Sequence, residues 1–290
     1  MKTLKQFNYL RPQAIAEAAA LLAKYKEPAK LIAGGTDLLV MMKDRAITAE
    51  YIIDLKSIPD LDQVTWDEKG GLSIGALTKI STLVNSDVIK GKFTSLHEAA
   101  KSLGTHQVRN MATIGGNICR SSPSADMIPP LLVCDARVKL VGQEGERTLL
   151  LNDFITGPGE NVLNNEILTE IRVAPEKRPS GTAFGKLGRL SEDLAKVNCA
   201  VKIVVTGGKC EDIRIALGAV APTPVRARKV EETLKGKEIS PEAIERAVEK
   251  VAEDIAPITD VRSSAEYRIQ VSQILIKRLI SEAIERLGEK

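Results

Sequence analysis

Two double glycines, placed far apart in the sequence, constrain this chain more than any other feature. Gly34-Gly35 follows the apolar run 31–33, and Gly115-Gly116 follows Thr113-Ile114. Both pairs are predicted to end apolar strands. Because glycine has no Cβ, the backbone at these positions can come close to a ligand and adopt positive φ angles.

Successive backbone N–H groups in such a loop can point into one concavity and hold an anion. Either loop alone is typical of a tight turn, as in the other double glycines of this chain. Together, two loops from separate strands could hold the two phosphates of a dinucleotide without a lysine. The side chains of Thr36, Thr113 and Asn117 would add hydrogen-bond donors.

The first two thirds of the chain mix helical and extended patterns. Apolar residues at helical spacing predict helices, and short apolar or alternating runs predict strands. The predicted helices are 12–25, 38–43, 80–84 and 96–103, and the predicted strands are 30–33, 51–55, 71–76, 137–141 and 167–173. A stretch rich in proline and charge at 175–179 predicts a domain boundary.

The last third is predicted to form a β-hairpin followed by helices. Residues 201–206 and 213–217 alternate on either side of Gly207-Gly208. Ser240-Pro241 is typical of an N-cap and first helical position. Ser263 and Glu266 predict a capping box before a long helix. The stripe on that helix predicted to pack in the core is Leu275, Leu279, Ala283 and Leu287.

Composition excludes several functions. The net charge is +3 and only 3% of residues are aromatic, which does not favour nucleic-acid binding. The N-terminus has no apolar core typical of a signal peptide, and no apolar run is long enough to span a bilayer, so a soluble, cytoplasmic protein is expected. Four cysteines without a C-x-x-C pair and two histidines predict no metal site. Cys134, Cys199 and Cys210 are predicted to be small buried apolar residues.

The sequence also has no P-loop, no G-x-G-x-x-G after a strand, no G-x-S-x-G and no H-E-x-x-H. What remains is the pair of glycine loops, and here the chain resembles the FAD-binding subunit of the molybdenum hydroxylases, the family of xanthine dehydrogenase and aerobic carbon monoxide dehydrogenase. Colinear blocks covering nearly the whole chain carry the resemblance. They are 33–39, 113–118, 122–126, 153–159, 166–168, 184–196, 216–224 and 267–268.

The resemblance implies an α+β fold. A two-subdomain FAD-binding domain of the PCMH/vanillyl-alcohol-oxidase type would occupy 1–176, with subdomains at about 1–57 and 58–176. A smaller α+β domain of the carbon monoxide dehydrogenase flavoprotein type, an antiparallel sheet plus helices, would occupy 177–290.

The resemblance also implies roles for individual residues. Two segments would hold the pyrophosphate and the nearby sugar groups of FAD, Asp126 would accept a hydrogen bond from a sugar hydroxyl, Leu168 would pack on the flavin and Lys186 would lie near its ring. Leu103 is a further contact position. The two segments are Leu31, Ile32, Ala33, Gly34, Gly35, Thr36, Asp37 and Leu38, and Thr113, Ile114, Gly115, Gly116 and Asn117.

Cys119 and Arg120 depart from the small or apolar residues of some relatives, and we expect their side chains to line the flavin pocket. Some relatives insert a cysteine-rich loop that carries a [4Fe–4S] cluster. This chain has no such insertion, so no cluster is expected.

The implied function is an FAD-carrying electron-transfer subunit of a heteromeric molybdenum hydroxylase, an oxidoreductase. Its partners would be a small [2Fe–2S] subunit and a large molybdopterin subunit, and its acceptor NAD or a quinone. No catalytic residue is expected in this chain, because the cofactor carries the redox chemistry. Two alternatives stay open: a stand-alone FAD-dependent reductase of related fold, and a non-catalytic assembly subunit.

Overall fold

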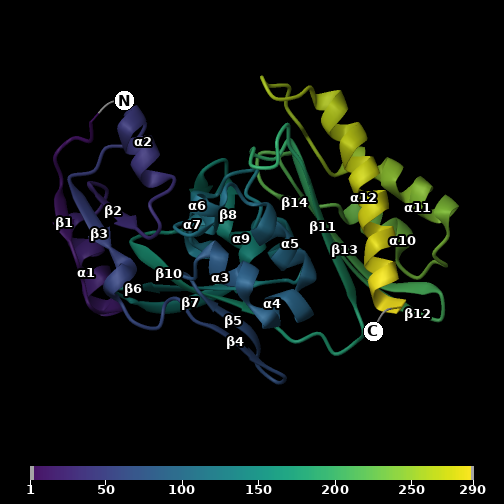
Figure 1. The fold of residues 1–290 in the computed structure, drawn as a ribbon, viewed down its shortest axis with the longest axis horizontal. Helices are drawn as coiled ribbons and strands as arrows, with labels where there is room; N and C mark the ends of the chain where they lie inside the picture. The colour runs from purple at the N-terminus through teal and green to yellow at the C-terminus, as the bar shows by residue number, and fades with distance from the viewer. Residues whose placement is uncertain (1–2, 289–290) are drawn as a thin grey trace.

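Three larger sheets follow one another along the chain and lie side by side across the molecule in the computed structural model, which describes residues 3–288 (Figure 1). The outermost residues of the predicted N-terminal segment and C-terminal domain, 1–2 and 289–290, lie outside the described residues. Helices and antiparallel sheets make up most of the structure, so the predicted α+β class is confirmed.

The first sheet is small and parallel, with strand order β1-β3-β2. Helix α1 packs beside it because Ala18, Ala19 and Leu22 recur at helical spacing on one buried face. The elements are β1 (Asn8–Leu10), α1 (Ile15–Tyr25), β2 (Ala29–Ile32), α2 (Leu38–Asp44), β3 (Tyr51–Asp54) and the 3-10 turn η1 (Leu55–Ser57). The first double glycine connects β2 to α2.

The second sheet is antiparallel, with order β4-β5-β10-β6-β7. Its strands are β4 (Val64–Asp67), β5 (Gly71–Gly75), β6 (Arg137–Gly142), β7 (Gly145–Leu150) and β10 (Glu166–Val173). Short helices cover it: α3 (Ile80–Asn85), α4 (Asp87–Lys92), α5 (Thr94–Ser102), α6 (His106–Arg109), α7 (Ile114–Arg120), α8 (Ile128–Val133) and α9 (Leu151–Phe154). A small hairpin of β8 (Ile155–Gly157) and β9 (Glu160–Asn161) follows α9.

The third sheet is antiparallel, in the order β11-β12-β13-β14. The helices that follow it in the chain lie on one face (Figure 1), and α5 and α8 pack on the other. The predicted hairpin is confirmed, since β12 and β13 pair directly and Gly207 and Gly208 turn the chain with φ angles of 57° and 77°. The elements are β11 (Gly181–Leu187), β12 (Val197–Thr206), β13 (Lys209–Gly218), β14 (Val225–Arg226), α10 (Arg228–Leu234), α11 (Pro241–Val248), the 3-10 turn η2 (Glu249–Glu253) and α12 (Ala265–Gly288).

Helix α12 packs closely on β11. A Cβ on Gly181 would lie 1.7 Å from the carbonyl oxygen of Ala283, so only glycine allows this approach. The predicted stripe on α12 is confirmed as core, because Leu279 and Ala283 are buried and the other two members pack against the same cluster. Cys199 and Cys210 are buried as predicted, and Cys134 is partly exposed.

Two local predictions are wrong. The second double glycine does not end a strand: it lies in the first turn of α7. The long C-terminal helix is not capped by Ser263, since the hydroxyl of Ser264 accepts the N–H of Tyr267 at 3.2 Å. The N-cap predicted at Ser240 is confirmed, with its hydroxyl accepting from the N–H of Ala243.

Candidate functional site

The two glycine loops, one after β2 and the other at the start of α7, approach each other at Gly34. A Cβ on Gly34 would lie 2.0 Å from the carbonyl oxygen of Met111, just ahead of the second loop. Gly35 has a φ of 73°, which turns the chain from β2 into α2 and which a residue with a Cβ adopts only with strain. Two segments far apart in sequence are thereby fixed against each other.

The first loop presents unused backbone donors. Within residues 3–288, no backbone or side-chain acceptor takes a hydrogen bond from the N–H groups of 34–38. These groups belong to the glycine turn and to the first residues leading into α2, where helix geometry leaves N–H groups without partners. A run of free N–H groups of this kind can hold an anion.

The second loop differs from the prediction, because the N–H groups of 114–117 are already used. Ile114 donates to the carbonyl oxygen of Thr78 at 3.0 Å, and Gly115 donates to that of Ala76 at 2.9 Å. Thr113 caps α7 and its hydroxyl accepts the N–H of Gly116 at 3.1 Å. The Thr113 hydroxyl proton and the side-chain NH2 of Asn117, rather than these backbone groups, are therefore the donors left for a ligand.

Gly116 is the position in the second loop that a ligand can approach. A Cβ there would meet only the Thr113 hydroxyl, at 3.0 Å, whereas a Cβ on Gly115 would lie 2.6 Å from the carbonyl oxygen of Ala76. The open side of Gly116 is a space that a side chain would fill. Together with the free N–H groups of 34–38, it fits the phosphate-bearing part of an extended cofactor.

Arg120 and Asp37 link the two loops by an exposed ion pair, with Nε and Oδ1 3.8 Å apart. The Arg120 guanidinium also lies beside Gly159, where a Cβ would come within 3.0 Å of Nη1. Burial raises the pKa of the neighbouring Cys119 thiol to about 12, so this thiol is neutral at physiological pH and is a poor nucleophile.

Asp126 and Lys186 lie far apart in sequence but form a buried ion pair. The Lys186 ammonium on β11 donates to Asp126 Oδ2 at 2.8 Å and to the carbonyl oxygen of Ser102 at 2.7 Å. Their side chains are only 6% and 7% exposed, which limits direct contact with solvent. Burial raises the pKa of Asp126, while Lys186 and a second donor, the side-chain amide of Asn198, oppose that rise.

A cleft of about 650 Å³ opens beside Lys186, between α5 and the end of β11. Leu103, a predicted contact residue, ends α5 between two residues that line the cleft, while Leu168 is buried in β10 beside a β-bulge. Arg109, which lines the cleft, comes four residues before Thr113 in the sequence. The lining residues are Glu98, Lys101, Ser102, Gly104, Arg109, Phe184, Lys186, Leu187, Gly188, Arg189, Leu190, Ser191 and Glu192.

Sequence reasoning missed two groups near these features. Asn198 on β12 donates its side-chain amide to Asp126 Oδ1 at 2.8 Å. Lys56, which pairs with the buried Asp54 at 2.6 Å, reaches the carbonyl oxygen of Ala33 at 3.3 Å. The one available signal was Asn198 itself, a polar residue inside an otherwise apolar strand.

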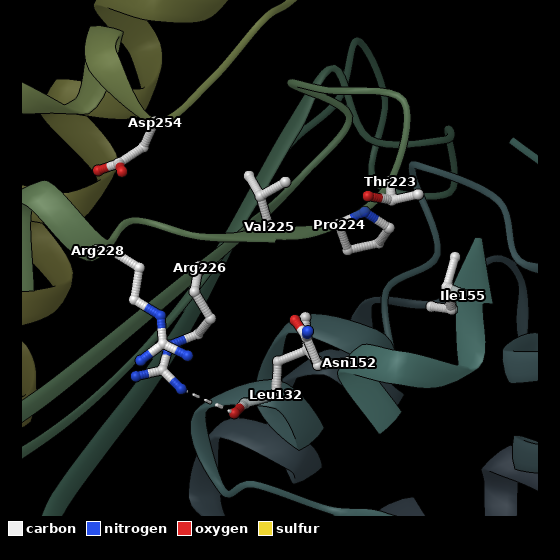
Figure 2. Close-up of a pocket in the computed structure, with 9 residues that line it drawn as sticks. All are labelled: Leu132, Asn152, Ile155, Thr223, Pro224, Val225, Arg226, Arg228 and Asp254. Atoms are coloured by element: carbon white, nitrogen blue, oxygen red, sulfur yellow. Dashed lines mark hydrogen bonds between the residues drawn. The ribbon is translucent and has the colours of Figure 1, made fainter. Parts of the chain in front are cut away.

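A second, smaller pocket of about 310 Å³ lies where α8, α9 and β8 face the segment 223–228 (Figure 2). Figure 2 shows the side chains of Arg226 and Arg228 close together at one end of it. Arg226 is already held by Glu231, with Nε and Oε1 2.7 Å apart, and by Asp135. The charge of Arg226 is therefore neutralised within the protein.

The free N–H groups of 34–38 and the open face of Gly116 are features of a protein that binds a cofactor bearing phosphates. Comparison with known proteins identifies the family. Residues 5–176 match the family described as FAD binding domain in molybdopterin dehydrogenase, and residues 182–283 match the CO dehydrogenase flavoprotein C-terminal domain. The chain therefore belongs to the FAD-binding subunits of the molybdenum hydroxylases, and its cofactor is FAD.

Individual relatives agree over nearly the full length. A putative xanthine dehydrogenase FAD-binding subunit of Escherichia coli is 34% identical, with 98% of each chain covered. The carbon monoxide dehydrogenase medium chain of Hydrogenophaga pseudoflava is 36% identical over 97% of this chain and 98% of that relative. A solved structure of carbon monoxide dehydrogenase from the same organism superposes with a TM-score of 0.95, covering 98% of this chain and 99% of that one.

Among residues 3–288, no helix is long and apolar enough to cross a membrane.

Proposed function

We propose that this chain is the electron-transfer subunit of a heteromeric molybdenum hydroxylase. Its partners are a small [2Fe–2S] subunit and a large molybdopterin subunit, assembled as a dimer of heterotrimers. When bound, FAD supplies the redox chemistry, accepting electrons that come from the iron–sulfur clusters and giving them to an external acceptor such as NAD or a quinone.

The meeting of the two glycine loops carries this proposal. The N–H groups of 34–38 would hold the pyrophosphate, and Gly116 would let the cofactor pass close to the backbone of α7. From there the cofactor would extend toward the cleft lined by Arg109 and Lys186. Such a path suits a long cofactor bound at one end by phosphate contacts and at the other by a ring system.

Within that path each side chain has a defined task. The hydroxyl of Thr113 would donate to a phosphate or sugar oxygen. Lys186 would lie near the flavin ring, where a positive charge stabilises the reduced, anionic form. Leu103 and Leu168 would contribute apolar surface near the ring, and Asp126 would accept from a sugar hydroxyl while holding Lys186.

Reconstitution of the purified chain with FAD tests the site. The wild type should show a flavin absorption band and quench FAD fluorescence, whereas Gly116→Val should lose both because its side chain fills the open face of α7. Gly91→Val is the matched control, since a Cβ at Gly91 meets nothing within 4 Å. Full FAD occupancy in Gly116→Val would contradict the placement of the cofactor here.

Purification from the native host tests the assembly. Recovery of this chain with an iron–sulfur and a molybdopterin subunit supports the proposal. Two results would favour the alternatives instead. Turnover of a sugar nucleotide with NADPH by the isolated chain would indicate a stand-alone reductase. A purified chain with no flavin band even after FAD addition would indicate an assembly subunit.

A further inference from the structure

The buried pair of Asp126 and Lys186 is completed by a residue of the third sheet, Asn198. Its amide nitrogen lies 2.8 Å from Asp126 Oδ1, and the residue is fully buried. The other carboxylate oxygen, Oδ2, accepts from Lys186 at 2.8 Å. Each oxygen of this carboxylate therefore has its own donor, one neutral and one charged.

The orientation of the Asn198 amide is fixed by charge. With Asp126 ionised, the opposite orientation would place the amide oxygen against the carboxylate, where two acceptors repel, so the nitrogen faces Asp126. The Asn198 oxygen then has no hydrogen-bond partner among residues 3–288, although it is buried. Leaving a buried acceptor unpaired is unfavourable, which suggests that the contact to Asp126 is retained for another reason.

The surroundings make room for this amide. Asn198 lies opposite Gly218 in the β12–β13 ladder, and a Cβ on Gly218 would lie 2.2 Å from the amide oxygen of Asn198. Beside them, Ala219 donates its N–H to the carbonyl oxygen of Pro123 at 2.6 Å. The third sheet thus holds the segment that carries Asp126 at both of its ends.

Lys186 is the group through which this arrangement reaches the cleft. An ammonium group has three N–H donors, and two of them are used by Asp126 and the carbonyl oxygen of Ser102. Lys186 also lines the cleft. The net charge presented there depends on whether Asp126 stays ionised, and hydrogen bonds to a carboxylate favour its ionised form.

We propose that Asn198 is a positioning residue for the flavin site, which holds Asp126 as an ionised partner and thereby sets the charge that Lys186 presents to the cleft. This inference rests on the proposed function, in which Lys186 lies near the flavin ring. The third sheet then contributes to the redox properties of a cofactor whose phosphates are held by the first two.

The test is the two-electron reduction potential of the FAD-loaded full chain, measured against a reference dye. Asn198→Leu removes the donor at similar size. Asp126 then protonates more readily and neutralises less of the positive charge of Lys186. The preference of the site for reduced over oxidised flavin should therefore rise by about fivefold. That factor is a rise of about 20 mV for a two-electron couple.

Three further variants test whether Asn198 affects the potential through Asp126 and Lys186. Asp126→Asn should raise the potential by more than Asn198→Leu does, and Lys186→Met should lower it. The double variant Asn198→Leu/Asp126→Asn should match Asp126→Asn alone, because residues that act through one partner are not additive. Thr182→Val is the control: it breaks a contact to the Ser95 N–H at the same interface without touching the pair, and should leave the potential unchanged.

The inference would be overturned if Asn198→Leu shifted the potential equally in the wild-type and Asp126→Asn backgrounds. It would also be overturned if Asn198→Leu did not shift the potential of the wild type. If Asn198→Leu folds poorly, Asn198→Ala also removes the donor and should shift the potential in the same direction. Failure of the proposed function looks different. In that case Lys186→Met and Asp126→Asn would both leave the potential of bound FAD unchanged.

Discussion

Gly34 and Gly116 differ in what a methyl group would meet. At Gly34 it would lie 2.0 Å from the backbone of Met111, whereas at Gly116 it would meet only a hydroxyl, at 3.0 Å. The glycine pattern alone predicts close approach to a ligand at every loop position. In the structure, Gly34 and Gly115 allow two chain segments to pack closely, whereas Gly116 leaves space that a ligand could occupy.

This difference predicts separate effects for two equal substitutions. Gly34→Ala should destabilise the chain by about 1–3 kcal/mol, because overpacking against backbone forces a shift. Gly116→Ala should leave the unfolding midpoint of the cofactor-free chain nearly unchanged and weaken FAD binding. Urea unfolding and FAD fluorescence titration measure the two effects. A Gly34→Ala chain as stable as wild type would contradict the assignment.

The residue types of the site were predictable from sequence, but their pairings were not. Asp126 and Lys186 were each expected to face the cofactor, yet they also bind one another. Asn198 joins them from a different strand. No sequence spacing relates these three positions, because tertiary packing alone brings them together.

At the scale of single elements, the prediction failed where two patterns overlap. The segment at Thr113-Ile114 resembles a strand end, because an apolar residue precedes the glycines. The structure forms a helix there, with Ile114 and Ile118 both fully buried on one face and Thr113 as the N-cap. The i, i+4 spacing of the two isoleucines was the signal that favoured a helix.

The start of α12 gives a test of the same kind. Ser264→Ala should cost about 1 kcal/mol of stability, because it removes the hydroxyl that accepts the N–H of Tyr267. Ser263→Ala, one residue earlier, should cost much less. Chemical denaturation of both variants decides the matter: equal losses would show that the cap is not at Ser264.

At the scale of the whole molecule, the order of the second sheet was beyond sequence reasoning. Strand β10 lies between β5 and β6, although the chain visits seven helices and several strands between β5 and β10. Alternation predicts that a strand exists and which face is buried, but not its neighbours. The predicted strands themselves lie at or close to their expected ranges.

We propose that the domain boundary lies between 176 and 177, where the chain leaves the second sheet for the third. The connecting segment is not loose. Glu176 pairs with Arg178 at 3.1 Å and with Lys202 of β12 at 3.0 Å, and Arg178 reaches Glu211 of β13 at 3.0 Å. These ion pairs tie the connection to the third sheet and fix where that sheet begins.

The same ion pairs predict how stability depends on pH. Burial opposes ionisation of Glu176, but hydrogen bonds from Arg178 and Lys202 outweigh it and lower its pKa from 4.5 to about 2. A carboxylate whose pKa is lower in the folded than in the unfolded state stabilises the fold fully when the pH is above the pKa of the unfolded state. That contribution is lost as the pH falls from about 4.5 toward about 2.

Glu176→Gln should therefore lower the thermal midpoint at pH 7, and its deficit relative to wild type should shrink as the pH falls from 5 to 3. Glu27→Gln is the control, because the Glu27 side chain is 86% exposed and pairs only with Lys30 on the surface. Exposed pairs of that kind contribute little, so this variant should follow wild type at every pH. A Glu176→Gln deficit that stays constant with pH would mean that the connection is held by packing rather than by charge.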